Sequence, residues 1–166
     1  MDLSEAALIE FFSECDEILQ RFSSNLSLAE QQKNLDGEII SALYRDMHTL
    51  KGSSQLFGFS LIAQVAHAIE ASLEPIRRLK MQLPAALVDA LFKAVDLIDK
   101  IVKESNLAKK EVTDRFENDV RQFVPTLLYA ASNQFSGELN LQKDKIISLR
   151  EDRIIANNIN ASTLVN

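Results

Sequence analysis

Apolar side chains recur along most of the chain at steps of three and four residues, the spacing that places them on one face of an α-helix. Short breaks, among them the polar stretch 31–37 and the turn signal Phe57-Gly58-Phe59, separate four such stripes. The stripes cover residues 8–26, 38–56, 61–79 and 84–102. Because amphipathic helices with short connections pack as antiparallel neighbours, the pattern predicts an all-α fold, an up-down antiparallel four-helix bundle.

The ends and interruptions of these stripes predict local features of the helices. Ser60 precedes the third stripe and is well placed to cap its helix. Pro75 inside that stripe is expected to kink the helix or weaken its hydrogen bonding near Ala71 rather than to end it. A fifth stripe predicts a helix at about 110–132. A weaker helical pattern follows, so we expect one domain at residues 1–135, with a core at 3–103, and a helical or partly ordered extension or linker at 136–166.

Composition and charge narrow the class of protein. The 166 residues include only 4 glycines and 3 prolines, too few for a turn-rich all-β fold. Eighteen basic against 24 acidic residues give a net charge of −6, which argues against nucleic acid or an anionic membrane as the partner. No apolar run is long enough to span a bilayer, and Glu5 and Glu10 oppose a signal peptide. We expect a cytoplasmic protein without membrane insertion.

The number and spacing of the residues argue against several kinds of metal and phosphate site. Two histidines and one cysteine are too few for a structural zinc site, and His67-x-x-Glu70 is the only pair that resembles half of a di-iron motif, in reversed order. The scattered glycines form no phosphate-binding loop. We therefore expect no metal, no cofactor and no ATP site in this chain, and whether it acts as an enzyme stays open.

One face of the second predicted helix carries residues suited to phosphoryl chemistry. His48, Lys51 and Gly52 stand at i, i+3 and i+4, and Tyr44 continues their line. A neutral imidazole offers a nucleophilic nitrogen, and Lys51 places a cation where a phosphoryl group would lie. Gly52 leaves clearance beside His48 although glycine costs a helix about 1 kcal/mol relative to alanine. The alternatives are a solvated His–Lys pair and a glycine that serves close helix packing.

The third predicted helix adds His67 and Glu70, again on one face. If the second and third helices are antiparallel, Glu70 reaches His48, fixes the imidazole tautomer and leaves the other ring nitrogen free. His67 would donate to the same site or to the phosphoryl oxygens. We expect the side chains of Lys51 and Glu70 to be exposed. The alternative is an ordinary polar helix face.

The residues around His48 also carry a family resemblance. The segment Asp46–Ser54, followed by Phe57-Gly58-Phe59, closely resembles the phosphoacceptor helix of histidine phosphotransfer (HPt) domains. The opening Phe11-Phe12 and the pair His67-x-x-Glu70 are similar, more narrowly, to the N-terminal HPt domain of chemotaxis-type (CheA-like) histidine kinases. The resemblance covers residues 3–103, and Met47 departs from it by replacing a small residue.

This resemblance implies an up-down helical bundle that takes part in a phosphorelay. His48 would be the phosphoacceptor, and Gly52 would match the small residue that the family has beside it. The network that supports the phosphoacceptor would consist of Lys51, His67 and Glu70. The implied partners are a histidine kinase catalytic domain, which phosphorylates His48, and the receiver domain of a response regulator, whose aspartate takes the group. A free-standing phosphocarrier and the leading fragment of a larger kinase both stay open. The alternatives are a non-catalytic helical adaptor or dimerisation module and a metal-binding bundle.

Overall fold

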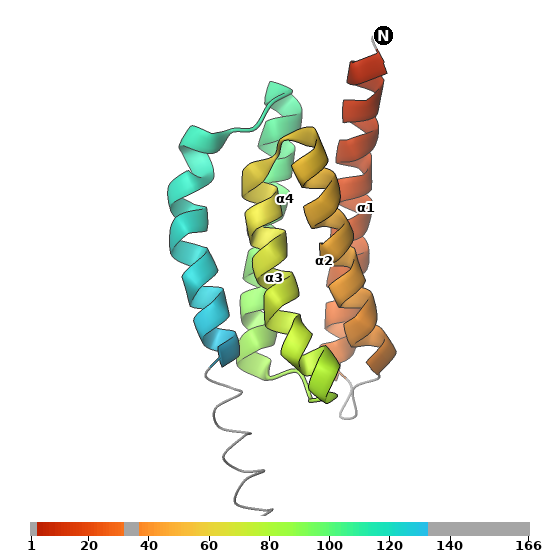
Figure 1. Ribbon diagram of the computed structural model, residues 1–166, viewed down its shortest axis with the longest axis vertical. Coiled ribbons are helices and arrows are strands. Elements are labelled where there is room, and N and C mark those ends of the chain that lie inside the picture. Colours follow the sequence, from red (N-terminus) through yellow and green to blue (C-terminus); the bar gives the residue numbers. More distant parts are fainter. Residues whose placement is uncertain (1–2, 32–36, 133–166) are drawn as a thin grey trace, which may run out of the picture. The chain divides into compact units, whose positions relative to one another are not determined.

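The computed structural model describes residues 3–31 and 37–132, and this part of the chain is helical (Figure 1). Its four labelled helices are α1 (Leu3–Gln31), α2 (Gly37–Phe57), α3 (Ser60–Leu79) and α4 (Ala85–Ala108). Residues 113–132 form a fifth helical stretch, called here the C-terminal helical segment. The prediction of an all-α fold with a fifth helix is confirmed.

Helices α1 to α4 form the predicted antiparallel bundle. Helix α2 packs against α1 and α3, α4 packs against the same two helices from the other side, and α3 makes its most extensive contact with α2. The chain direction alternates from each helix to the next (Figure 1). The long contact between α2 and α3 therefore brings the two predicted polar faces, one on each helix, next to each other.

The apolar stripes form the core. Met47 and Leu50 of α2 and Ile69 and Leu73 of α3 are fully buried. Burying an aliphatic side chain of this size stabilises the folded state by about 1.5–3 kcal/mol. The stripes thus fix how each helix is rotated, and the polar positions between them are left at the helix boundaries and on the surface.

An aromatic cluster fixes the turn between α2 and α3. The ring of Phe11 on α1 stacks on Phe57 and Phe59, with centroids 4.7 and 5.0 Å away. Between these two phenylalanines, Gly58 adopts φ +80°, a left-handed conformation that glycine reaches without a Cβ clash. The cluster holds the end of α2 and the start of α3 in one register, which sets the relative heights of residues further along the two helices.

The start of α3 differs from the prediction that Ser60 caps it. The N-cap residue is Phe59, which makes no side-chain cap, and Ser60 Oγ instead donates to Glu111 Oε2 at 2.9 Å. The backbone N–H of Leu61 donates to Glu111 Oε1 at 2.5 Å. A carboxylate from far along the chain therefore takes the place of a local cap, since helix N-termini favour negative charge. Helix α3 continues through Pro75 as predicted, and the kink there stays a prediction.

The structure describes only part of the chain, and this limits two of the sequence predictions. The extension at 136–166 lies outside the described residues, so the division of the chain at residue 135 stays a prediction. Within the described ranges, no helix is both long enough and apolar enough to cross a membrane.

The cap from Glu111 predicts a long-range contribution to stability. Glu111→Ala removes both hydrogen bonds to the start of α3 and should lower the free energy of unfolding by about 1 kcal/mol, the usual effect of losing a helix N-cap. Urea denaturation followed by circular dichroism measures this change. In the control Glu117→Ala, an exposed i, i+4 pair with Arg121 is lost, which should cost at most about 0.5 kcal/mol. Equal losses in the two variants would contradict the capping role.

Candidate functional site

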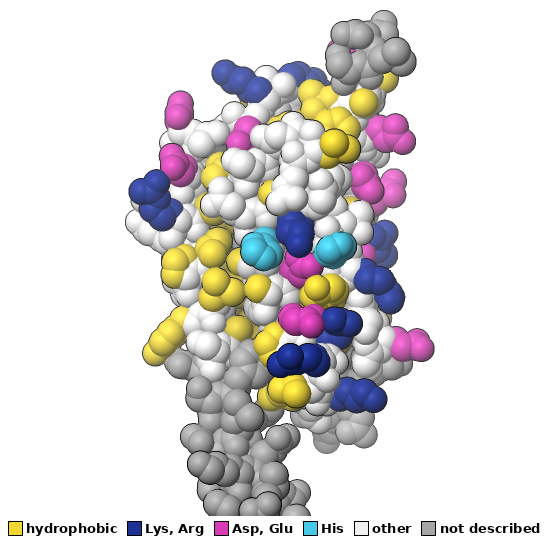
Figure 2. Space-filling view, viewed as in Figure 1, with side chains coloured by type: hydrophobic (Ala, Val, Ile, Leu, Met, Phe, Trp, Pro, Cys, Tyr) yellow, Lys and Arg dark blue, Asp and Glu magenta, His cyan; other side chains and the backbone are white. Residues whose placement is uncertain are grey.

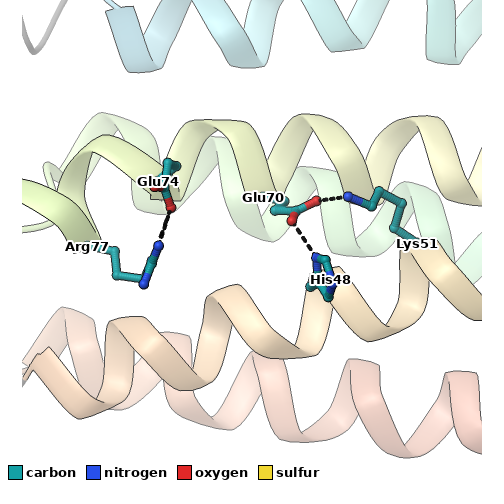
Figure 3. A network of polar contacts seen from close by, with 5 residues as sticks. All are labelled: His48, Lys51, Glu70, Glu74 and Arg77. Carbon is teal, nitrogen blue, oxygen red and sulfur yellow. Dashed lines mark hydrogen bonds and ion pairs between the residues drawn. The ribbon is translucent and has the colours of Figure 1, made fainter.

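A single carboxylate on α3 joins the predicted residues of α2. His48 Nδ1 lies 2.7 Å from Oε1 of Glu70, and Lys51 Nζ lies 2.5 Å from Oε2 of the same carboxylate. Figure 3 shows both side chains reaching across from α2 to Glu70. The prediction that Glu70 reaches His48 between antiparallel helices is confirmed.

The exposure of these side chains corrects one expectation. The side chain of His48 is 64% exposed, that of Lys51 21% and that of Glu70 only 7%. The prediction that Glu70 is exposed is therefore wrong, and Lys51 is only partly accessible. Glu70 directly follows the buried Ile69 and belongs to the face of α3 that packs on α2, so the neighbouring helix covers it.

The contact with Glu70 sets the tautomer of His48. An ionised carboxylate only accepts hydrogen bonds, so the Nδ1 atom beside Glu70 must carry a proton. In the neutral ring the lone pair then lies on Nε2, the nitrogen that Glu70 does not engage. The site thus presents an exposed imidazole with a defined nucleophilic nitrogen, Nε2, and a buried carboxylate at the other ring nitrogen.

Tyr44 is a site residue that the sequence analysis placed on the line of His48 but gave no role. Its ring stacks on the imidazole of His48 at a centroid distance of 6.3 Å and an interplanar angle of 13°. Interaction of its hydroxyl with the Glu70 carboxylate, together with burial, raises the pKa of Tyr44. The i, i+4 spacing from Tyr44 to His48 was the available signal, whereas the contact with Glu70 depends on the packing of α3.

The charge of Glu70 follows from these contacts. Burial raises the pKa of the Glu70 carboxyl, but hydrogen bonds from Lys51, His48 and Tyr44 oppose burial and leave the pKa below its ordinary value of 4.5. Glu70 is therefore ionised at neutral pH. Its negative charge lies against Nδ1 of His48, where it stabilises positive charge on the ring.

The last two predicted residues lie on the same surface without joining this network. His67 is exposed on α3, and among the described residues no hydrogen bond or ion pair links it to His48, Lys51 or Glu70. Figure 2 shows the two histidines of the chain on one face, on either side of a basic side chain. The supporting role of His67 stays a prediction.

Gly52 is exposed, and within the described part of the chain nothing outside its own helix backbone lies within 4 Å of the place where a Cβ would project. The alternative that this glycine serves close helix packing is therefore wrong. A side chain at this position would point into open space beside His48, so only an approaching partner would meet it.

Other reactive groups of the bundle are less suited to chemistry. Burial raises the pKa of the Cys15 thiol to about 12, so it stays protonated at neutral pH and lies inside the core. Over residues 3–31 and 37–132, no three His, Cys, Asp or Glu side chains gather as metal ligands would. The exposed imidazole of His48 is the group with the geometry of a nucleophile.

Comparison with known proteins relates the site to one family. The Hpt domain family matches residues 6–104, a segment that contains His48, Lys51, Gly52, His67 and Glu70. Among solved structures, the chain is similar to the phosphorylated P1 domain of CheA3 in complex with CheY6 from R. sphaeroides. The TM-score is 0.65 at 19% identity, over 75% of this chain and 96% of that one, which shows the fold.

Curated relatives are much longer than the segment they share with this chain. Chemotaxis protein CheA of Listeria monocytogenes is 31% identical over 94 residues, covering 57% of this chain and 15% of that protein. CheA of Bacillus subtilis is 32% identical over 103 residues, 62% of this chain and 15% of that protein. CheA of Cereibacter sphaeroides is 24% identical over 144 residues, which cover 86% of this chain and 20% of that protein. The matched segment thus spans at most a fifth of these relatives.

The lowered pKa of Glu70 predicts a pH-dependent contribution to stability. A carboxyl with a lower pKa in the folded than in the unfolded state stabilises the fold above pH 4.5, and this stabilisation is lost as the pH falls. Urea denaturation of the wild type and Glu70→Gln at pH 7 and at pH 3 measures it. The wild type should be the more stable protein at pH 7, and the difference should shrink at pH 3. A difference independent of pH would contradict the ionised state of Glu70.

Proposed function

Because the chain belongs to the Hpt domain family, we propose that it carries a phosphoryl group on His48 from a histidine kinase to an aspartate of a response regulator. The observation that carries this proposal is the pairing of an exposed imidazole with a buried carboxylate at its Nδ1 atom, 2.7 Å away. This pairing leaves Nε2 as the phosphoacceptor atom. Phosphotransfer, rather than hydrolysis or synthesis, is the function of the domain.

In the first half of the reaction, His48 acts as the nucleophile. The lone pair of Nε2 attacks the γ-phosphorus of ATP held by the kinase, the N–P bond forms, and the bond from phosphorus to the β,γ-bridging oxygen breaks as ADP leaves. Nδ1 keeps its proton, so the ring gains positive charge. Glu70 stabilises that charge at hydrogen-bond distance, and Lys51 sets a cation near the phosphoryl oxygens.

In the second half, a carboxylate oxygen of the regulator's aspartate attacks the same phosphorus. The N–P bond breaks and its electron pair returns to Nε2, which restores the neutral ring with the proton still on Nδ1. The domain supplies a nucleophile, its orientation and complementary charges. The kinase brings ATP and its magnesium, and the regulator brings the ion beside its aspartate.

Two lines of support come from the similar proteins. The curated relatives are chemotaxis CheA proteins, and the similar solved structure is a phosphorylated domain in complex with CheY6. A regulator of the CheY kind is therefore the proposed acceptor, and a CheA-type kinase catalytic domain is the proposed donor. A non-catalytic helical adaptor is the alternative, and it predicts a chain that takes up no phosphoryl group.

Labelling tests the phosphoacceptor. The chain is incubated with radiolabelled ATP and Bacillus subtilis CheA from which the segment matching this chain has been removed, and in parallel with CheY6 that carries a labelled phosphoryl group. The wild type should gain acid-labile, base-stable label, and His48→Gln should gain none. The matched control His67→Gln, which removes the other exposed imidazole of the same face, should keep the label. Label on His48→Gln, or a wild type unlabelled by both donors, would contradict the proposal.

Gly52 gives a test in which stability and function move in opposite directions. Since the added Cβ of Gly52→Ala meets open space in the free domain, the helix should gain stability, by up to about 1 kcal/mol. Phosphoryl transfer should slow, because the methyl group stands beside His48 where a partner approaches. Urea denaturation and the initial rate of labelling measure the two effects. An unchanged rate of labelling would show that Gly52 provides no clearance for the partner.

A further inference from the structure

A hollow of about 720 Å³ opens between the start of α2 and the end of α3. The buried side chains of Ile40 and Ile76 contribute to its lining. Its polar lining includes Arg45, Arg77, Lys80 and Glu38. The hollow therefore combines apolar surface with an excess of positive charge, since three cationic side chains and one carboxylate line it.

The positive charge of this hollow stands out in a chain whose net charge is −6. Arg45 and Lys80 are exposed, and neither has an ion-pair partner among the described residues. Arg77 forms an ion pair with Glu74, with 2.8 Å between Nη2 and Oε2. Two other hollows have the opposite sign. One, along α1, is lined by Glu10, Glu14 and Glu17, and the other, between α1 and α4, by three aspartates and one lysine. The hollow between α2 and α3 is thus a place where an acidic surface would be attracted.

Two ring contacts connect this hollow with the phosphoacceptor site. The guanidinium of Arg77 lies 4.5 Å above the ring of Tyr44, and that ring stacks on His48 at 6.3 Å. Arg45 precedes His48 by three residues on α2 and so lies on a neighbouring position of the helix surface. Basic side chains gather on the face in Figure 2 that carries both histidines. A partner large enough to cover His48 would also cover the hollow, since a specific interface buries about 800 Å² on each partner.

We propose that this hollow docks an acidic segment of the response regulator as its aspartate takes the phosphoryl group from His48. The proposal rests on the proposed function. The regulator is the occupant that the charges favour, because its acceptor aspartate and the oxygen ligands of its divalent ion bring an acidic surface to His48, and carboxylates at the edge of that surface would reach the hollow. Complementary charges would speed the encounter and fix the orientation of the two proteins, with the apolar lining covered on docking.

Charge reversal in the hollow tests the proposal. The double variant Arg45→Glu/Lys80→Glu is compared with Lys93→Glu/Lys100→Glu, an equal change of charge at exposed positions of α4, which does not pack on α2. All proteins are first labelled on His48 by the kinase, and transfer of the label to purified CheY6 is followed by rapid quenching at low and high salt. Circular dichroism checks that each variant is folded.

The expected result separates the hollow from general charge effects. Transfer to CheY6 at low salt should fall about tenfold in Arg45→Glu/Lys80→Glu and lose most of its salt dependence. Labelling by the kinase, and transfer in the α4 control, should stay near the wild-type rates. Equal losses in both double variants, or an equal loss of labelling by the kinase, would overturn the proposal. A wild type that takes no label, or that keeps its label in the presence of CheY6, would instead overturn the proposed function.

Discussion

The site depends on one buried carboxylate held between two helices. Glu70 accepts hydrogen bonds from His48 and Lys51 of α2, and these donors, with Tyr44 of the same helix, keep its pKa low and the carboxylate ionised although α2 covers it. A buried carboxylate without such partners would take up a proton, because burial penalises its charge. With Glu70 neutral, Nδ1 of His48 would lose its acceptor, and the tautomer that exposes Nε2 as a nucleophile would no longer be fixed.

The scaffold supplies the alignment that this carboxylate needs. The stacked rings of Phe11, Phe57 and Phe59, with the left-handed Gly58 between the last two, fix where α2 ends and α3 begins. From that turn, the buried stripes of both helices determine how each is rotated. A shift of one residue turns a helix by about 100° and would carry Glu70 away from His48. Packing far from the imidazole thus decides the chemistry at the imidazole.

The surface around His48 is built for partners rather than for a small ligand. The nucleophile is exposed, and Gly52 beside it leaves open space. The proposed phosphotransfer needs a donor or acceptor atom in line with Nε2, and an exposed position on the helix surface would let two different proteins reach that atom in turn. One hollow of this surface is lined by basic and another by acidic side chains, and the proposed docking would use this difference to orient an incoming protein.

The sequence by itself determined the helices, the bundle and the family, because apolar periodicity and a dense motif are local properties of the chain. It also placed His48 and Lys51 on one helix face, since that follows from their spacing. Only the tertiary structure decided that Glu70 is buried, that Tyr44 joins it, that His67 stays outside the network and that Glu111 rather than Ser60 serves the start of α3. Periodicity specifies which face of a helix is apolar, but not the height and rotation of the helix beside it. Those two quantities come from the packing of side chains distant in the sequence, and they decide which polar atoms meet.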